Sequence, residues 1–310
     1  MSNNKIRIAT RKSPLALWQA NYVKGLLEQY HDKLEVELVA LHTQGDRILD
    51  TPLSSVGGKG LFIKELEEAL FDGRADIAVH SMKDVTVDLP DGLALPVILE
   101  REDPRDVFIS NQYNSIKELS GGTCIGTSSL RRQSQIRAAN PELICHDLRG
   151  NVGTRLNKLE DGKIDAIILA AAGIKRLGMQ DRINEYLDVE YLLPAIGQGA
   201  IGIEMRSDDK VTLGLIKQLN HESTRICVEA ERAFGKRLFG GCQLPIAAYA
   251  TIVNRNLTVH GLVGRVDGSK LVKDMVNGKP EQGSHLGQQL ADKLLAQGAG
   301  EILQEVTNAR

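Results

Sequence analysis

The sequence is poor in aromatic residues and in cysteine. Aromatic side chains make up only 4% of its 310 residues, so its cores must be built mainly from aliphatic side chains. Its four cysteines are too few for a disulfide scaffold in a chain of this length, and no two of them have the CxxC spacing that is typical of zinc sites. We therefore expect reduced thiols and no bound metal. The cysteines are Cys124, Cys145, Cys227 and Cys242.

Signals for a membrane, for secretion and for nucleic acid are also missing. No apolar run approaches the roughly 20 residues that span a bilayer, and the N-terminal segment has no signal-peptide core. The formal net charge is −2, so any basic site must be a local concentration of arginine and lysine. We expect a cytoplasmic monomer that binds small molecules and neither nucleic acid nor membranes.

What the sequence does contain is an alternation of strands and helices. With 42% hydrophobic and 25% charged residues, the composition is typical of a globular protein, and the length allows two or three domains. The order strand, helix, strand, helix, strand occurs over residues 5–80 and again over 123–170, which predicts two α/β lobes with parallel sheets. The similar segments DGRADIAV (72–79) and DGKIDAII (161–168) support this repetition, since each places a glycine before a buried strand. The expected strands are 5–9, 35–41, 76–80, 123–126, 143–148 and 166–170, and the expected helices are 14–30, 62–71, 129–139 and 152–159.

A third unit is expected after the two lobes. From about residue 222 the pattern changes to a helix, three alternating strands and a closing helix, which predicts a small α+β domain with an antiparallel sheet. Two segments, 95–104 and 193–200, are expected to cross between the lobes and to leave a cleft, where open α/β sheets bind their ligands. The expected domains are 1–98 with 199–218, then 99–198, then 219–310. The expected C-terminal elements are a helix at 227–238, strands at 246–251, 257–263 and 271–277, and a helix at 285–307.

Arginines follow the predicted strands at one edge of each sheet. Arg11 precedes Ser13, an expected helix N-cap, and backbone N–H groups at such a helix start attract anions; a solvated side chain is the alternative for each arginine taken alone. Arg131 and Arg132 are neighbours on a helix and point about 100° apart, so either they bind different anions or one of them serves the structure. Guanidinium groups hold carboxylates and phosphates through paired hydrogen bonds, so we expect a ligand with several anionic groups. The arginines that follow strands are Arg11, Arg131, Arg132, Arg149, Arg155 and Arg176.

Other motifs carry groups that could take part in chemistry. Lys83 and Asp84 close an apolar strand, and a carboxylate among arginines could stabilise a cation and move protons, although a surface ion pair is the simpler interpretation of the motif alone. Cys242 lies in a GGCQLP loop, where its thiol is either reactive or incidental, whereas the other cysteines lie in apolar patterns that are typical of buried residues. The polar stretch 48–60, which contains Lys59, is expected to be a mobile lid.

Taken in order, these motifs closely resemble those of the porphobilinogen deaminase (hydroxymethylbilane synthase) family, over essentially the whole chain. No single motif is specific, but the ordered set is. The motifs are RKSPLA (11–16), GGKGLF (57–62), HSMKD (80–84), GTSSLRR (126–132), LRGN (148–151), GQG (197–199) and GGCQLP (240–245).

The resemblance implies an enzyme of tetrapyrrole biosynthesis, with two similar doubly wound lobes like those of type II periplasmic binding proteins and a small third domain. Such an enzyme joins four porphobilinogen molecules head to tail with loss of ammonia and releases hydroxymethylbilane. It uses a dipyrromethane cofactor, linked through a thioether to the cysteine that matches Cys242, and the aspartate that matches Asp84 is the catalytic acid and base. The resemblance assigns cofactor binding to Lys83, Asp84, Thr127, Ser128, Ser129, Arg131, Arg132, Arg155 and Gly173, and substrate binding to Arg11, Ser13, Arg149, Arg155, Arg176 and Gln198.

Two other functions fit parts of the sequence. A two-lobed binding protein for a small polyanion would have no use for the third domain and its cysteine loop. An acyl transferase with a cysteine nucleophile would need a base near Cys242, and the sequence identifies none. Thr86, Phe239 and Leu244 depart from the residues that are common in the family at these positions, but none of them replaces a reacting group.

Overall fold

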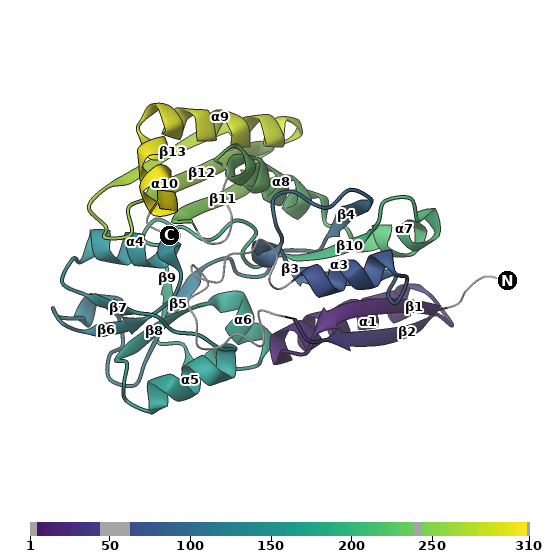
Figure 1. Cartoon of the computed structure of the whole chain (residues 1–310), viewed down its shortest axis with the longest axis horizontal. Coiled ribbons are helices and arrows are strands. Elements are labelled where there is room, and N and C mark those ends of the chain that lie inside the picture. The colour runs from purple at the N-terminus through teal and green to yellow at the C-terminus, as the bar shows by residue number, and fades with distance from the viewer. Residues whose placement is uncertain (1–4, 44–62, 239–243, 309–310) are drawn as a thin grey trace.

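The computed structural model describes residues 5–43, 63–238 and 244–308, which form two α/β lobes and a smaller C-terminal unit (Figure 1). Cys242, Lys59 and the whole of the expected lid lie outside the described residues. Within the described ranges, no helix is long and apolar enough to cross a bilayer, and no cluster of His, Cys, Asp or Glu side chains could hold a metal ion.

The first lobe is built on a five-stranded sheet with the order β2-β1-β3-β10-β4. Strands β1, β2 and β3 run parallel, as predicted, but β10 runs antiparallel to both of its neighbours. The predicted parallel pairing is therefore confirmed, and the sheet is mixed because β10, which the sequence does not predict as a strand, joins it in the opposite direction. The strands are β1 (Lys5–Arg11), β2 (Glu35–Leu41), β3 (Ile77–Ser81), β4 (Leu93–Ile98) and β10 (Ile201–Arg206).

The second lobe repeats this plan with the order β7-β6-β8-β5-β9, in which β5 is the antiparallel strand. Strand β5 follows the first crossing between the lobes, and β10 follows the return crossing. Each lobe thus receives its antiparallel strand from a crossing, and because residues 95–98 belong to β4, the first crossing is shorter than expected. The strands are β5 (Asp106–Ser110), β6 (Cys124–Gly126), β7 (Ile144–His146), β8 (Ala166–Ala170) and β9 (Glu185–Leu187).

The repeated DG motif occupies the same place in both lobes. Its glycine has a positive φ in each case, +74° in the first lobe and +71° in the second. Asp76 Oδ2 accepts a hydrogen bond from the backbone N–H of Arg7 at 2.8 Å, and Asp165 Oδ2 accepts one from the backbone N–H of Cys124 at 2.7 Å. The segment that leads into β3 is thus hydrogen-bonded to β1, and the segment that leads into β8 is hydrogen-bonded to β6, the corresponding strand of the second lobe. The predicted similarity of the lobes is confirmed.

The helices that cover the two sheets include all those that the sequence predicts, and α6 and α7 in addition, which it does not predict. Helix α1 begins after Ser13, whose Oγ accepts a hydrogen bond from the N–H of Ala16 at 3.4 Å, with Pro14 in its first turn. The buried core that it covers consists of aliphatic side chains and one methionine. The helices are α1 (Pro14–Tyr30), α3 (Lys64–Phe71), α4 (Leu130–Ala139), α5 (Val152–Glu160), α6 (Ala171–Arg176) and α7 (Lys210–Ile216), with short 3₁₀ turns η1 (Met82–Asp84), η2 (Ile116–Glu118), η3 (Gln180–Arg182) and η4 (Lys217–Leu219).

The C-terminal unit is a three-stranded antiparallel sheet with helices, as predicted. Its sheet lies between α9 and helix α4 of the second lobe, and α4 contacts all three strands (Figure 1). The single closing helix that the sequence predicts is wrong, because the chain turns at Gly298 (φ +94°) and forms two helices. The elements are α8 (Glu222–Arg237), β11 (Ile246–Val253), β12 (Asn256–Gly264), β13 (Leu271–Gly278), η5 (Pro280–Gln282), α9 (Gly283–Ala296) and α10 (Ala299–Asn308).

Candidate active site

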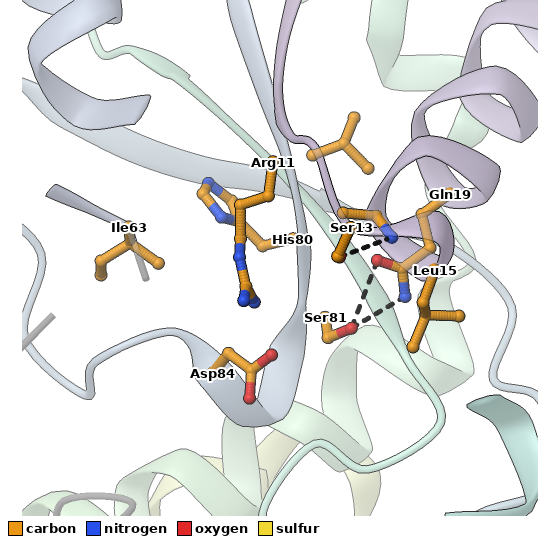
Figure 2. Close-up of a pocket in the computed structure, with 10 residues that line it drawn as sticks. Arg11, Ser13, Leu15, Gln19, Ile63, His80, Ser81 and Asp84 are labelled. Atoms are coloured by element: carbon orange, nitrogen blue, oxygen red, sulfur yellow. Dashed lines mark hydrogen bonds between the residues drawn. The ribbon is translucent and has the colours of Figure 1, made fainter. Parts of the chain in front are cut away.

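The end of β3 leads into a pocket of the first lobe, whose lining comes from β1, α1, β3 and the η1 turn. Figure 2 shows the guanidinium group of Arg11 and the carboxylate of Asp84 pointing toward one another in this pocket. Ser13 and Ser81 also line it, and the Nε2 of Gln19 donates a hydrogen bond to Ser81 Oγ at 2.8 Å. The fold thus brings together three residues that the sequence nominates separately: Arg11, Ser13 and Asp84.

The turn that carries Lys83 and Asp84 is held by the return crossing. The N–H of Met82 donates to the carbonyl oxygen of Ala200 at 3.0 Å. Gly197 has a φ of +69° and packs on the same turn, where an added Cβ would lie 2.7 Å from the Cβ of Met82, so only glycine fits. The segment that links the lobes therefore helps to position Asp84.

Helix α8 of the C-terminal unit holds the residues that follow Asp84. Nη2 of Arg232 donates to the carbonyl oxygens of Thr86 and Val87, at 2.8 and 3.2 Å. The helix ends shortly before Cys242 in the sequence. One helix therefore connects the Asp84 turn with the chain segment that leads to the expected attachment cysteine.

Positive groups of the second lobe face Lys83 and Asp84 of the first. Burial lowers the pKa of Lys83 to about 8; the charge of Asp84 opposes this shift, and Arg132 and Arg155 add to it. Burial likewise lowers the pKa of Arg155 to about 10, with Arg132 adding to the shift and Asp84 opposing it. Such mutual effects arise only between groups that lie near one another, so one carboxylate faces cations from both lobes.

Arg131 and Arg132 bind the same carboxylate, which neither interpretation of the sequence foresees. Nη2 of Arg131 lies 2.8 Å from Asp106 Oδ2, and Nη2 of Arg132 lies 2.7 Å from Asp106 Oδ1. The two side chains leave the helix in different directions, but both are long enough to reach one carboxylate. The sequence feature that could have identified Asp106 is its position as a charged residue at the start of an apolar segment, which forms β5.

Gln198, expected on the substrate side, is only 1% exposed and lies against Asp106. Its Nε2 donates to the carbonyl oxygen of Pro104 at 2.7 Å and to Asp106 Oδ1 at 3.0 Å. Since Gln198 belongs to the return crossing and Pro104 to the first, this amide ties the two crossings together. The role of Gln198 in substrate binding stays a prediction.

Arg149 offers N–H groups that have no partner among the described residues. Its Nε and Nη2 are buried and make no hydrogen bond within the part of the chain that the structure describes. The loop after it is compact: Gly150 has a φ of +108°, and Asn151 Oδ1 caps α5 by accepting from the N–H of Thr154 at 2.9 Å. Arg155 Nε donates back to the carbonyl oxygen of Gly150 at 2.9 Å. Buried N–H groups without partners are costly, so Arg149 is suited to a ligand carboxylate.

The hydroxyl residues before α4 shape the entry to this helix. Thr127 Oγ1 accepts a hydrogen bond from the N–H of Ser129 at 3.3 Å, and Ser128 Oγ donates to the carbonyl oxygen of Leu148 at 3.1 Å. Ser129 is the N-cap residue, but its side chain makes no capping hydrogen bond. Gly173 lies in α6, where an added Cβ would meet α1 at an ordinary contact distance. The role of these four residues in cofactor binding stays a prediction.

Arg176 lies between the lobes. Its Nη2 donates to the carbonyl oxygen of Gly199 at 2.7 Å, and its guanidinium carbon is 5.7 Å from the ring centre of Trp18 in α1. Burial lowers the pKa of Arg176 to about 10, with Glu102 opposing the shift. The described contacts of Arg176 join α6 to the first lobe, and its role in substrate binding stays a prediction.

A buried imidazole and carboxylate join β3 to β10 beside the pocket. Nε2 of His80 lies 2.9 Å from Oε2 of Glu204, while Glu204 Oε1 is buried and has no partner among the described residues. Glu67 of α3 lies close by, and its pKa is raised to about 7, by burial first and then by the charge of Glu204. The sequence motifs do not point to Glu67 or Glu204, although a histidine inside an apolar strand is a signal for a buried partner.

This arrangement suits a ligand with several carboxylates. Cations from β1, α4 and α5 surround the end of β3. Nearby, buried N–H groups of Arg131, Arg132 and Arg149 have no partner among the described residues. Asp84 lies among them and can hold or transfer a proton there.

Two family models match the chain. Residues 6–214 match a model described as porphobilinogen deaminase, dipyromethane cofactor binding domain. Residues 225–296 match a model described as porphobilinogen deaminase, C-terminal domain. The first match covers more than half of the chain, and it includes every expected site residue except Cys242, which lies in the second.

Solved structures of low sequence identity are similar to part of the chain. The methionine-binding protein MetQ is 15% identical, with a TM-score of 0.45 over 70% of this chain and 89% of that chain. The periplasmic VFT2 domain of Bordetella pertussis BvgS is 14% identical, with a TM-score of 0.44 over 70% and 86%. A lipoprotein of the YaeC family from Enterococcus faecalis is 11% identical, with a TM-score of 0.43 over 70% and 91%.

Proposed function

The chain belongs to the porphobilinogen deaminase family, and from this premise we propose how its own residues act in tetrapyrrole biosynthesis. The enzyme joins four porphobilinogen molecules head to tail with loss of ammonia to give hydroxymethylbilane. We propose that this transferase works as a monomer, because one chain supplies all of the site residues described above. The observation that carries the proposal is the position of Asp84, which faces Arg11 and lies among cations of the second lobe.

The described residues fit a cofactor that carries carboxylates. Each porphobilinogen bears an acetate and a propionate group, so a chain of linked pyrroles is a polyanion. Buried guanidinium nitrogens of Arg131, Arg132 and Arg149 have no partner within the described ranges, and ligand carboxylates would satisfy them. When bound, the dipyrromethane supplies the pyrrole carbon to which the first substrate is joined. The residues that we propose to hold it are Lys83, Asp84, Thr127, Ser128, Ser129, Arg131, Arg132, Arg155 and Gly173.

Asp84 is proposed to carry out the acid–base chemistry. Its carboxylate can accept a hydrogen bond from the pyrrole N–H of the substrate and so orient the ring. Positive charge develops on that ring as ammonia leaves, and a carboxylate in the same pocket stabilises it. Forming each new carbon–carbon bond releases one proton from a ring carbon, and Asp84 can take up this proton.

The basic groups around Asp84 are proposed to bind the carboxylates of the substrate. Arg11 faces Asp84, so one substrate molecule could place a carboxylate on Arg11 and its pyrrole N–H on Asp84. The Nε and Nη2 of Arg149, which have no partner in the described ranges, suit a second carboxylate. The residues that we propose for substrate binding are Arg11, Ser13, Arg149, Arg155 and Arg176, with Gln198 acting through Asp106.

Intact-mass spectrometry of the active protein tests the covalent part of the proposal. We propose that Cys242 carries the cofactor through a thioether, so wild-type protein should show the excess mass of two linked pyrroles and Cys242→Ser should not. Cys145→Ser, which changes a half-buried cysteine of β7, is the matched control and should keep the excess mass. A bare polypeptide mass for active wild-type protein would overturn the proposal.

A further inference from the structure

A fully buried carboxylate lies between the two adjacent arginines of α4. Asp106, which is 0% exposed, accepts hydrogen bonds from Nη2 of Arg131, Nη2 of Arg132 and Nε2 of Gln198, at 2.8, 2.7 and 3.0 Å. Burial alone would raise the pKa of Asp106, but the two guanidinium groups outweigh burial and hold the pKa well below its usual range. Asp106 is therefore an anion at neutral pH.

The protein also engages the other terminal nitrogens of the two arginines. Nη1 of Arg131 donates to the carbonyl oxygen of Leu193 at 2.7 Å, and Nη1 of Arg132 donates to that of Ile168 at 2.9 Å. The Nε of each arginine is buried and has no partner in the described part of the chain. The pair thus keeps only part of its hydrogen-bonding capacity for a ligand, because the protein already fills one anion position.

The charge of Asp106 also reduces the capacity of Arg131 and Arg132 to bind ligand anions. Two guanidinium cations and one carboxylate leave a single positive charge where the sequence suggests two. Lys83 lies close enough for Asp106 and Arg132 to shift its pKa in opposite directions, so this balance extends to the proposed site. Without Asp106, two buried cations would both need ligand anions, because unpaired buried charges are strongly unfavourable.

We propose that Asp106 is a specificity-determining residue, an internal carboxylate that occupies one anion position between Arg131 and Arg132 and so limits the number of ligand carboxylates that the pair can hold. Gln198 is then a positioning residue, since its amide holds Asp106 in this place. The inference rests on the proposed function in one respect, that ligand carboxylates bind Arg131 and Arg132.

Inorganic phosphate is a suitable probe, because its dissociation constant can be measured on the purified holoenzyme without turnover, from the rise of the melting temperature with phosphate concentration. Asp106→Asn should bind phosphate about tenfold more tightly than wild type, since charged hydrogen bonds become available to it. Asp103→Asn is the matched control: Asp103 pairs with Arg105 outside this cluster, and its loss should leave the phosphate dissociation constant as in wild type.

Two further variants separate a charge effect from a structural one. Asp106→Glu keeps the charge and should show a phosphate dissociation constant near the wild-type value. If Asp106→Asn does not fold, the double variant Asp106→Asn with Arg132→Gln restores the charge balance and should recover the fold. Phosphate dissociation constants that are equal in wild type and folded Asp106→Asn would overturn the proposal, as would a double variant that also fails to fold.

The outcomes also distinguish this proposal from the proposed function. Tighter phosphate binding by Asp106→Asn, in a protein whose active wild type carries no pyrrole adduct, would support the role of Asp106 and overturn the proposed cofactor attachment. Equal phosphate dissociation constants for wild type and Asp106→Asn, in a protein that does carry the adduct, would overturn the role of Asp106 and support the proposed cofactor attachment.

Discussion

Arg101 and Glu231 form a buried, bidentate ion pair, in which Nη1 and Nη2 of Arg101 lie 2.8 and 2.9 Å from Oε1 and Oε2 of Glu231. Arg101 belongs to the first crossing, and Glu231 lies on α8. The same carboxylate accepts hydrogen bonds from the N–H of Gly197, in the return crossing, at 2.7 Å and from the N–H of Ala250, in β11, at 2.8 Å. One side chain of the C-terminal unit therefore joins both crossings.

Glu231→Gln should lower the free energy of unfolding by about 3–5 kcal/mol, because it leaves the buried guanidinium of Arg101 without its counter-ion. Urea denaturation measures the change. Glu229→Gln on the same helix is the control: Glu229 pairs with Arg225 and its side chain is 44% exposed, so about 1 kcal/mol or less is expected. An equal loss of unfolding free energy in the two variants would show that the buried ion pair stabilises the fold no more than the surface pair does.

Asp84→Asn should lower kcat by about a hundredfold or more, since the amide can no longer take up a proton or balance positive charge. The covalent adduct should persist in at least part of the protein, because the proposed attachment is at Cys242. Single-turnover kinetics and intact mass measure the two effects separately. Asp91→Asn, an exposed position in the same lobe, serves as the control. Near-normal turnover by Asp84→Asn would remove Asp84 from its assigned role.

Arg232→Gln should lower kcat about tenfold to a hundredfold with a smaller change in KM, because the carbonyl oxygens of Thr86 and Val87 lose the guanidinium that holds the Asp84 turn. Steady-state kinetics with porphobilinogen measures this split. Arg225→Gln is the matched control on the same helix, where Arg225 pairs with surface carboxylates. A rise in KM with unchanged kcat would contradict a positioning role for Arg232.

Glu67→Gln should change how the stability of the protein depends on pH. Burial raises the pKa of Glu67 from its ordinary value of 4.5 to about 7 in the folded protein, so the folded state binds more protons than the unfolded state between these two pH values. The contribution of Glu67 to stability is therefore fully present below pH 4.5 and is lost as the pH rises through 7.

Compared with wild type, Glu67→Gln should thus gain stability above pH 7, and this gain should shrink as the pH falls toward 4.5. Melting temperatures measured from pH 5 to pH 8 test this expectation, with Glu68→Gln, an exposed neighbour, as the control. A difference between Glu67→Gln and wild type that stays constant across this pH range would contradict it.

Elements with strong local signals are predicted well. Helix α1 begins and ends where Ser13, Pro14 and the apolar periodicity indicate, and β2 and β8 have the predicted bounds. Strands β4, β5, β9 and β10 are not predicted as strands. They owe their place in the sheets to pairing with strands that are distant in the sequence, and such pairing leaves little local signal.

The candidate site shows the same division. That arginines would gather at the strand ends could be expected, because the carboxyl ends of parallel strands share one edge of a sheet. That Arg131 and Arg132 would share one carboxylate could not, since Asp106 lies 25 positions from Arg131 in the sequence. Gln198 illustrates the point further, because it reaches the same carboxylate from 92 positions away.

The sequence by itself determined the aliphatic cores, the repeated α/β plan, the antiparallel C-terminal sheet and the residues that carry charge toward a ligand. These follow from composition, local periodicity and capping, which act over a few residues. Only the tertiary structure decided which strand is antiparallel in each lobe, which crossing holds the Asp84 turn, and which carboxylates fill the arginine-rich site from within. The physical reason is that a buried charge needs a partner nearby in space. The two crossings bring such partners together from distant parts of the sequence, so no local pattern identifies them.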